Sequence, residues 1–143
     1  MADSGMPESQ SRRMLLKPKI HVLVVDDDKL VRAALARGLR GHFQVTDVGS
    51  VEEAMTLVNG GAAFAAVVTD VEMPTTGQEF VRWLESHAPL LAERTIVISG
   101  GPRDPALRAW CATLPRGRFF PKPLRVAVLV SAIEAVATEP PAV

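Results

Sequence analysis

Short apolar runs alternate along this chain with longer segments in which apolar residues recur at every third or fourth position. Most of the runs are rich in β-branched residues, which is typical of strands buried on both faces of a parallel sheet. The second run partly alternates between apolar and polar residues, so we expect it at an edge of the sheet. The expected strands cover residues 20–25, 43–48, 65–70, 95–99 and 118–120.

Capping signals mark where the longer segments begin as helices. Ser50 and Thr76 each precede a glutamate by three residues, which is the spacing of a capping box. Asp104 followed by Pro105 favours another helix start, whereas Pro89 is expected to end the helix before it. The expected helices cover about residues 29–39, 50–59, 76–88, 104–114 and 125–138.

Five strands that alternate with five helices predict an α/β domain built on a doubly wound, five-stranded parallel sheet with right-handed crossovers. In the first helix we expect the apolar residues to face the sheet and the basic ones to face water. The apolar set is Leu30, Val31, Ala34, Leu35 and Leu39, and the basic set is Lys29, Arg32 and Arg37. We expect one domain over residues 19–138, a disordered tail over 1–18 and a short tail over 139–143, with no output domain after it.

Composition narrows the classes of protein. Sixteen basic residues balance sixteen acidic ones among the 143, so we expect neither nucleic acid nor an anionic membrane as a direct partner. The single Cys111 excludes an internal disulfide and suits a reducing compartment. No apolar run approaches the roughly 20 residues that span a bilayer, and residues 1–18 lack the apolar region of a signal peptide. We therefore expect a cytoplasmic protein.

Acidic residues follow the first and third strands, at the point where each strand ends. Asp26, Asp27 and Asp28 come after the first, and Asp70 ends the third. If these strands are neighbours, the carboxylates share one edge of the sheet, where they repel one another unless a cation neutralises them. Mg²⁺ suits such a cluster because it takes one or two carboxylates, keeps several waters and binds phosphate oxygens.

The other two strand ends carry groups that bind anions. Lys122 supplies a compact positive charge, and the Lys122–Pro123 peptide bond is a candidate for the cis form. Ser99 supplies a hydroxyl, and the two glycines after it leave room for a ligand to approach the backbone. A carboxylate nucleophile, a divalent ion, a lysine and a hydroxyl together form a site that accepts a phosphoryl group.

The stretches VLVVDDD, TDVEMP, IVISG and FFPKPL, in this order and at these separations, resemble the receiver domain of two-component response regulators over about residues 20–138. The resemblance implies a flavodoxin-like sheet of strand order 2-1-3-4-5. It also implies phosphotransfer from a sensor histidine kinase or a phosphotransfer protein in a phosphorelay, with Mg²⁺ as cofactor. The domain is then no enzyme beyond its own phosphorylation and dephosphorylation, and it can form a phosphorylation-dependent homodimer through the last two helices and the fifth strand.

The same resemblance implies roles for individual residues. Asp70 is then the phosphoacceptor, Asp27 binds Mg²⁺, and Asp26 completes the acidic pair without direct contact. Glu72 gives its backbone carbonyl to the metal. The residues that contact the phosphoryl group and report on it are Ser99, Lys122 and, as the switch aromatic, Phe119.

Two stretches depart from the family's pattern. Between Pro74 and Gly77 the loop is one residue shorter than usual, and residues 114–117 replace the small-residue turn that commonly precedes the last strand. The second stretch and the paired glycines after Ser99 are more similar to receivers of hybrid histidine kinases. Both departures obscure the output surface, although neither changes a residue expected to contact the phosphoryl group.

Two other functions remain open from the sequence. A haloacid-dehalogenase-type phosphohydrolase also uses a strand-end Asp-x-Asp, a serine and a lysine, which Asp26, Asp28, Ser99 and Lys122 could supply, but the chain is short for that class and has Lys29 where its pattern has Thr or Val. A pseudo-receiver that only binds partners would lack an acid or the lysine, and neither is missing here.

Overall fold

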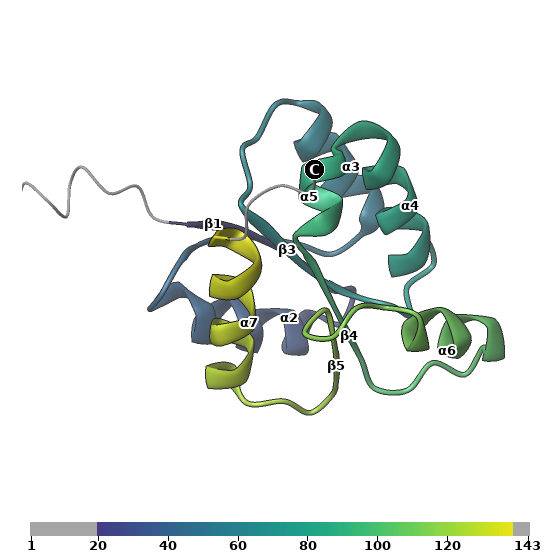
Figure 1. Cartoon of the computed structure of the whole chain (residues 1–143). Coiled ribbons are helices and arrows are strands. Elements are labelled where there is room, and N and C mark those ends of the chain that lie inside the picture. Colours follow the sequence, from purple (N-terminus) through teal and green to yellow (C-terminus); the bar gives the residue numbers. More distant parts are fainter. Residues whose placement is uncertain (1–19, 139–143) are drawn as a thin grey trace, which may run out of the picture.

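The computed structural model describes residues 20–138, so the predicted tails at 1–18 and 139–143 lie outside the described residues. It contains one five-stranded sheet of order β2-β1-β3-β4-β5, in which every neighbouring pair is parallel (Figure 1). This confirms the predicted doubly wound α/β architecture. The strands are β1 His21–Val25, β2 Gln44–Val48, β3 Ala66–Asp70, β4 Thr95–Ser99 and β5 Phe119–Pro121.

Six helices connect and cover the strands in the described part of the chain, one more than predicted. The additional helix begins at Pro89, which does end the preceding helix but also starts a new turn, because proline suits the first position of a helix. None of the helices in residues 20–138 has both the length and the apolar character needed to cross a membrane. They are α2 Lys29–Arg40, α3 Val51–Asn59, α4 Gly77–His87, α5 Pro89–Glu93, α6 Pro105–Ala112 and α7 Val126–Thr138.

The sheet is covered on both faces, with α2 and α7 on one side and α3, α4 and α5 on the other (Figure 1). All five residues of β3 and of β4 are buried, as expected for central parallel strands. Side chains alternate between the faces, so Val68 packs towards α7 whereas its neighbour Val67 packs towards α4. A smaller cluster around Cys111 packs α6 against the sheet.

The predicted helix starts hold with one correction. The capping box at Thr76 and Glu79 is complete. At Ser50 only half of it forms: the serine oxygen accepts the Glu53 N–H, but the Glu53 carboxylate accepts the Ser50 hydroxyl instead of the Ser50 backbone N–H. Asp104 caps α6 by accepting the Ala106 N–H.

Helix α2 is rotated relative to the prediction. Leu30 is 82% exposed, although it was expected to face the sheet, whereas Leu39 is buried as expected. Arg32 was expected to face water but has a side chain only 20% exposed, which pairs with Asp47. The Asp28 cap fixes the residue at which the helix begins, and that start decides which residues of the helix face the sheet.

Candidate functional site

Three carboxylates meet at the carboxyl edge of the sheet. Because β1 and β3 are paired, with Val25 opposite Thr69, the residues that follow them are brought together. One oxygen from each of Asp26, Asp27 and Asp70 lies within 4.8 Å of the others. Asp26 and Asp70 are buried, whereas Asp27 is exposed. Three oxygen ligands at this spacing, open to solvent on one side, fit Mg²⁺, which prefers carboxylates and retained waters.

Lys122 joins this acidic cluster from the far end of the sequence. Its Nζ lies 2.9 Å from Asp26 Oδ2 and 3.4 Å from Asp70 Oδ1. The residue follows β5, where its backbone N–H donates to the Ser99 carbonyl at 2.7 Å. The Lys122–Pro123 peptide bond is cis, the form that the sequence admitted. One ammonium group therefore neutralises part of the charge of two buried carboxylates.

The cluster shifts the pKa values of its members. Burial raises the pKa of Asp70 to about 6, and the neighbouring Asp26 charge acts in the same direction, while Lys122 opposes both. Burial acts to lower the pKa of Lys122, but its hydrogen bond to Asp26 and the two negative charges outweigh burial, so this pKa is raised. The lysine stays protonated at neutral pH, and Asp70 becomes a carboxylate only above about pH 6.

Asp26 and Asp28, two of the three consecutive aspartates, make different contacts. Both carboxylate oxygens of Asp26 are engaged, Oδ1 by the backbone N–H of Asp28 and Oδ2 by Lys122. Asp28 caps α2 by accepting the N–H groups of Leu30 and Val31. The phosphohydrolase alternative needs Asp28 as an acid in the site, and its position at the helix cap counts against that function.

Ser99 ends β4 beside Asp70, whose register partner is Ile98. The serine is 2% exposed, and its Oγ accepts the backbone N–H of Gly101 at 3.1 Å. Gly101 has φ of +100°, a backbone region that favours glycine. Since Oγ acts here as an acceptor, the hydroxyl proton stays available for an anion bound near Asp70.

Glu72 and Phe119 lie at the rim of the site. The exposed Glu72 side chain accepts the backbone N–H of Arg103 at 3.2 Å, so it ties the loop after β3 to the loop before α6. Its carboxylate lies outside the cluster of three. Phe119 is half-buried and packs against the cluster under α6, whose buried members include Val97 and Leu107.

Gly77 is a site residue whose importance sequence reasoning did not recognise. A Cβ at this position would lie 2.3 Å from the Asp70 carbonyl oxygen and 3.1 Å from Val71 Cα. The Gly77 N–H donates to the Val71 carbonyl at 2.9 Å. The first residue of α4 therefore lies directly against the backbone at the end of β3. The short stretch between Pro74 and Gly77 was the signal available in the sequence.

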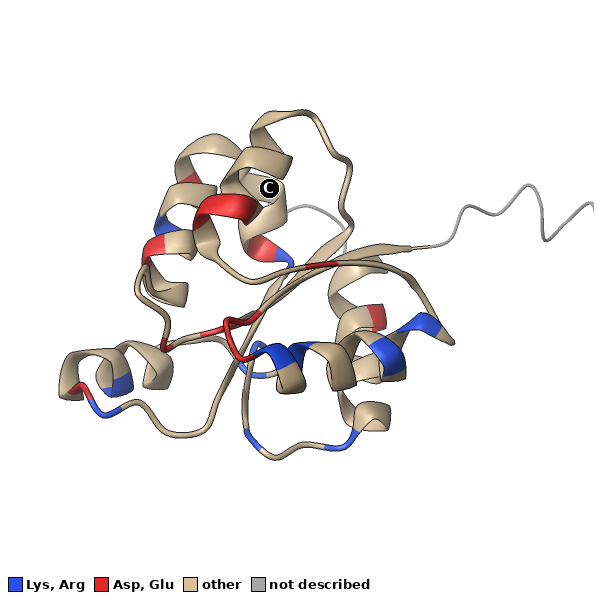
Figure 2. Ribbon diagram, turned by 180° about the vertical axis from the view of Figure 1, so that it is seen from behind, with Lys and Arg blue, Asp and Glu red and all other residues tan. Residues whose placement is uncertain are grey.

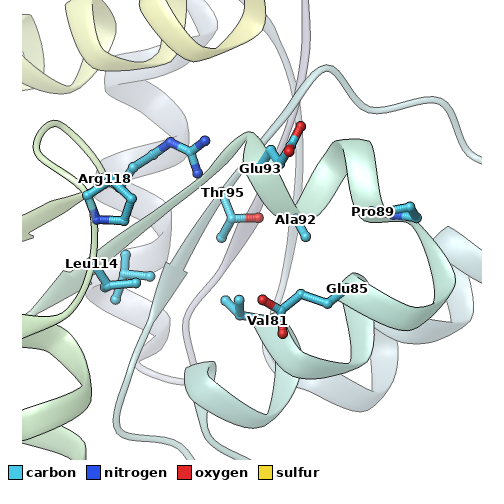
Figure 3. A pocket seen from close by; sticks show the side chains of 10 residues that line it. Val81, Glu85, Pro89, Ala92, Glu93, Thr95, Leu114 and Arg118 are labelled. Atoms are coloured by element: carbon cyan, nitrogen blue, oxygen red, sulfur yellow. The ribbon is translucent and has the colours of Figure 1, made fainter. Parts of the chain in front are cut away.

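A groove lies at the opposite end of the sheet from the acidic cluster, near the start of β4. This groove has a volume of about 650 Å³ and an apolar floor that includes Val81 and Ala92. In Figure 3, Leu114 and Arg118 lie on one side of it, and Val81 and Glu85 on the other. None of the residues predicted to carry chemistry lines it. The residues from which the sequence predicts phosphoryl chemistry lie at the carboxyl edge instead.

Comparison with known proteins agrees with the geometry of the carboxyl edge. The family model described as "Response regulator receiver domain" matches residues 22–134. The "Two-component response regulator ORR11" of Oryza sativa is 32% identical over 107 residues, which cover 73% of this chain and 72% of that protein. A "Protein-glutamate methylesterase/protein-glutamine glutaminase" of Azospirillum brasilense is 29% identical over 110 residues, which are only 27% of its length.

Solved structures share the fold. A response regulator receiver protein from Sinorhizobium medicae superposes with a TM-score of 0.70 at 25% identity, over 83% of this chain and 94% of that one. The FixJ-N crystal structure superposes with a TM-score of 0.71 at 27% identity, over 89% of this chain and 100% of that one.

Proposed function

Because the chain belongs to the family of response regulator receiver domains, we propose that it accepts a phosphoryl group on Asp70 from a sensor histidine kinase or a phosphotransfer protein. The observation that carries the proposal is the convergence of Asp26, Asp27 and Asp70 on one small volume, with Lys122 between two of them. An arrangement of buried carboxylates around one lysine is costly for folding and is best explained by chemistry on an anion.

The proposed transfer is a single displacement. An Asp70 carboxylate oxygen attacks the phosphorus of a phosphohistidine, and the P–N bond breaks so that an acyl phosphate forms on Asp70. The electron pair of the broken bond stays on the imidazole, which carries a proton on its other ring nitrogen and therefore leaves as the neutral ring. Lys122 and the Ser99 hydroxyl hold the equatorial oxygens of the phosphoryl group. Bound Mg²⁺ supplies positive charge that offsets the charge on those oxygens.

The ligands proposed for Mg²⁺ are Asp27 and Asp70, with the backbone carbonyl of Glu72. Support for a direct role of Asp27 comes from its exposure and from Asp26, whose two oxygens are already used by Lys122 and the Asp28 N–H. Asp26 would then act by holding Lys122 rather than by contacting the ion.

Intact-mass measurement after treatment with a small phosphodonor tests this function. The wild-type protein should gain the mass of one phosphate in the presence of Mg²⁺ and none in the presence of a chelator. Asp70→Asn should gain none, because the amide is not a nucleophile of this kind. Phosphorylation of Asp70→Asn together with none of Asp26→Asn would transfer the nucleophile to Asp26 and favour the phosphohydrolase.

Output is proposed to pass through Ser99 and Phe119. A dianion on Asp70 attracts the Ser99 hydroxyl, and a shift of the loop that carries Gly101 changes the packing beside Phe119. The surface affected comprises α6, β5 and α7, through which a second copy of the chain could bind.

The proposal places the domain in the cytoplasm without nucleic acid as a direct partner and with no catalysis beyond its own phosphorylation and dephosphorylation. If the domain were instead a pseudo-receiver, the Asp70→Asn variant would bind the partner as tightly as the wild-type protein does.

The protein phosphodonor is proposed to cover the apolar surface beside Lys122. A groove of about 320 Å³ between α2 and the start of α7 is lined by Val31, Leu35 and Leu124, and Lys122 itself forms part of its wall. Leu30 lies at the start of α2 and is 82% exposed. A donor domain that brings a histidine to Asp70 has to lie against this side of the site.

Leu30→Asp should therefore slow phosphotransfer from a protein donor about tenfold while leaving the rate with a small phosphodonor unchanged. The expected loss corresponds to about 1.4 kcal/mol, in the range of one apolar contact at an interface. Leu90→Asp is the matched control, because Leu90 is also exposed but lies on α5. Equal rates for both variants with a protein donor would exclude Leu30 from the docking surface.

A further inference from the structure

Arg32 reaches from α2 to the backbone of the acidic loop. Its Nη1 donates to the carbonyl oxygen of Asp26 at 2.8 Å, and its Nε lies 3.3 Å from Asp47 Oδ2. The side chain is only 20% exposed. A partly buried guanidinium group that bonds a main-chain carbonyl at one end of its fork and a carboxylate at the other is held in one orientation.

The peptide that Arg32 holds is the one that joins Asp26 to Asp27. On the other side of Asp26, the backbone N–H donates to the Val48 carbonyl of β2 at 3.2 Å. The main chain of Asp26 is therefore fixed by one bond on each side. Because the held carbonyl belongs to the same planar peptide as the Asp27 nitrogen and Cα, its orientation fixes the N–Cα bond of Asp27, from which the Asp27 side chain projects.

The guanidinium group of Arg32 fills a space that is open because Gly49 has no side chain. A Cβ at Gly49 would lie 2.8 Å from Arg32 Nη1, so a larger residue at position 49 would displace the group. Asp47 holds it from β2 and also binds Arg40 through its second oxygen, with Arg40 Nη2 3.0 Å from Asp47 Oδ1. Figure 2 shows the red acidic loop running directly into the blue first turn of α2.

We infer that Arg32 is a positioning residue for the metal and phosphoryl site, which it orients by holding the Asp26–Asp27 peptide. The inference rests on the proposed function. The charge of Arg32 and its hydrogen bond have opposite consequences for Mg²⁺. Removal of a nearby positive charge should by itself strengthen the binding of a cation to the acidic cluster. Release of the peptide should weaken it, because the ligands lose their orientation.

Mg²⁺ titration calorimetry on the metal-free protein separates these effects. Arg32→Ala should weaken Mg²⁺ binding about tenfold, as for loss of a residue that orients metal ligands. Arg40→Ala is the matched control, because Arg40 shares Asp47 but makes no bond to the acidic loop, and its affinity should stay within about twofold of wild type. Unchanged or tighter binding by a folded Arg32→Ala overturns the inference.

Gly49→Ala gives an independent perturbation that keeps the arginine in the chain. It should weaken Mg²⁺ binding in the same direction as Arg32→Ala, because the added methyl group displaces the guanidinium group. This variant also keeps the test decisive if Arg32→Ala does not fold. Wild-type affinity in a Gly49→Ala protein would contradict the inference.

A second measurement needs neither metal nor phosphate. Amide hydrogen exchange by NMR should become faster at Asp26 and Asp28 in Arg32→Ala, because the Asp26 N–H donates to the Val48 carbonyl and the Asp28 N–H to the Asp26 carboxylate, and both bonds depend on the backbone that Arg32 holds. Exchange should be unchanged in Arg40→Ala. Equal protection in both variants would contradict the inference.

A wild-type protein that takes up no phosphate would refute the proposed function, whereas phosphorylation of wild type and Arg32→Ala at the same rate would refute only the role of Arg32.

Discussion

Gly77→Ala is expected to lower the free energy of unfolding by about 3 kcal/mol, at the upper end of the range for overpacked sites, and to abolish most phosphorylation of Asp70. The new Cβ would lie 2.3 Å from the Asp70 carbonyl oxygen, and this neighbour is backbone that cannot swing aside like a side-chain tip. The same carbonyl accepts the hydroxyl of Thr69 at 2.9 Å. Relief of the clash must therefore move the main chain that carries the phosphoacceptor.

Urea unfolding followed by tryptophan fluorescence, with intact-mass measurement after phosphodonor treatment, checks both parts of this expectation. Gly41→Ala is the control: no atom lies within 4 Å of its added Cβ, and the backbone there is right-handed helical, so the change should be neutral or slightly stabilising. A Gly77→Ala protein as stable as Gly41→Ala, with wild-type phosphorylation, would show that α4 can move away without disturbing Asp70.

Asp70→Asn is expected to stabilise the metal-free protein by about 3 kcal/mol at pH 7.5 and to have little effect near pH 4. The pKa of Asp70 is raised from 3.8 to about 6, chiefly by burial. Between pH 3.8 and about pH 6, the Asp70 carboxyl group is more protonated in the folded protein than in the unfolded chain. Stability contributed by this group therefore falls as the pH rises through this window, and the cost is complete above about pH 6. Asparagine is neutral throughout and does not incur the cost.

Chemical denaturation of both proteins from pH 4 to pH 8 in the presence of a chelator measures this difference. Asp104→Asn is a suitable comparison, because asparagine caps a helix as well as aspartate does and Asp104 is exposed at the start of α6. Addition of Mg²⁺ should stabilise wild type more than Asp70→Asn, since the cation binds the folded acidic cluster. A stability difference that stays flat across the pH range would mean that the Asp70 carboxylate is not disfavoured by its burial.

The sequence was sufficient to place the four strand ends at one site, because parallel strands leave their carboxyl ends at one edge whatever the details of packing. Asp70, Ser99 and Lys122 each follow or end an apolar run that could be recognised alone. Their meeting then depends only on the strand order. The roles proposed for them in phosphotransfer remain predictions.

What the sequence could not reveal depended on rotation and on close backbone contacts. Leu30 and Leu35 both belong to a helical apolar pattern, but five residues at about 100° each place them roughly 140° apart, so they cannot both face the sheet. Arg32 is basic, so the sequence pattern groups it with the residues of the helix that face water. Only its hydrogen bond to the Asp26 carbonyl in the structure sets it apart from them. The helix from Pro89 was missed because a proline that ends one helix can begin the next.

The short fifth strand has a consequence for how two copies of this domain could associate. The backbone N–H of Lys122 donates inwards to the Ser99 carbonyl, so the nitrogen of the preceding residue, Pro121, faces away from β4 towards the open edge. Proline has no hydrogen there, and the edge therefore lacks a donor that an incoming strand would need. A dimer across this edge has to be joined by side chains of β5 and the flanking helices, not by one continuous ten-stranded sheet.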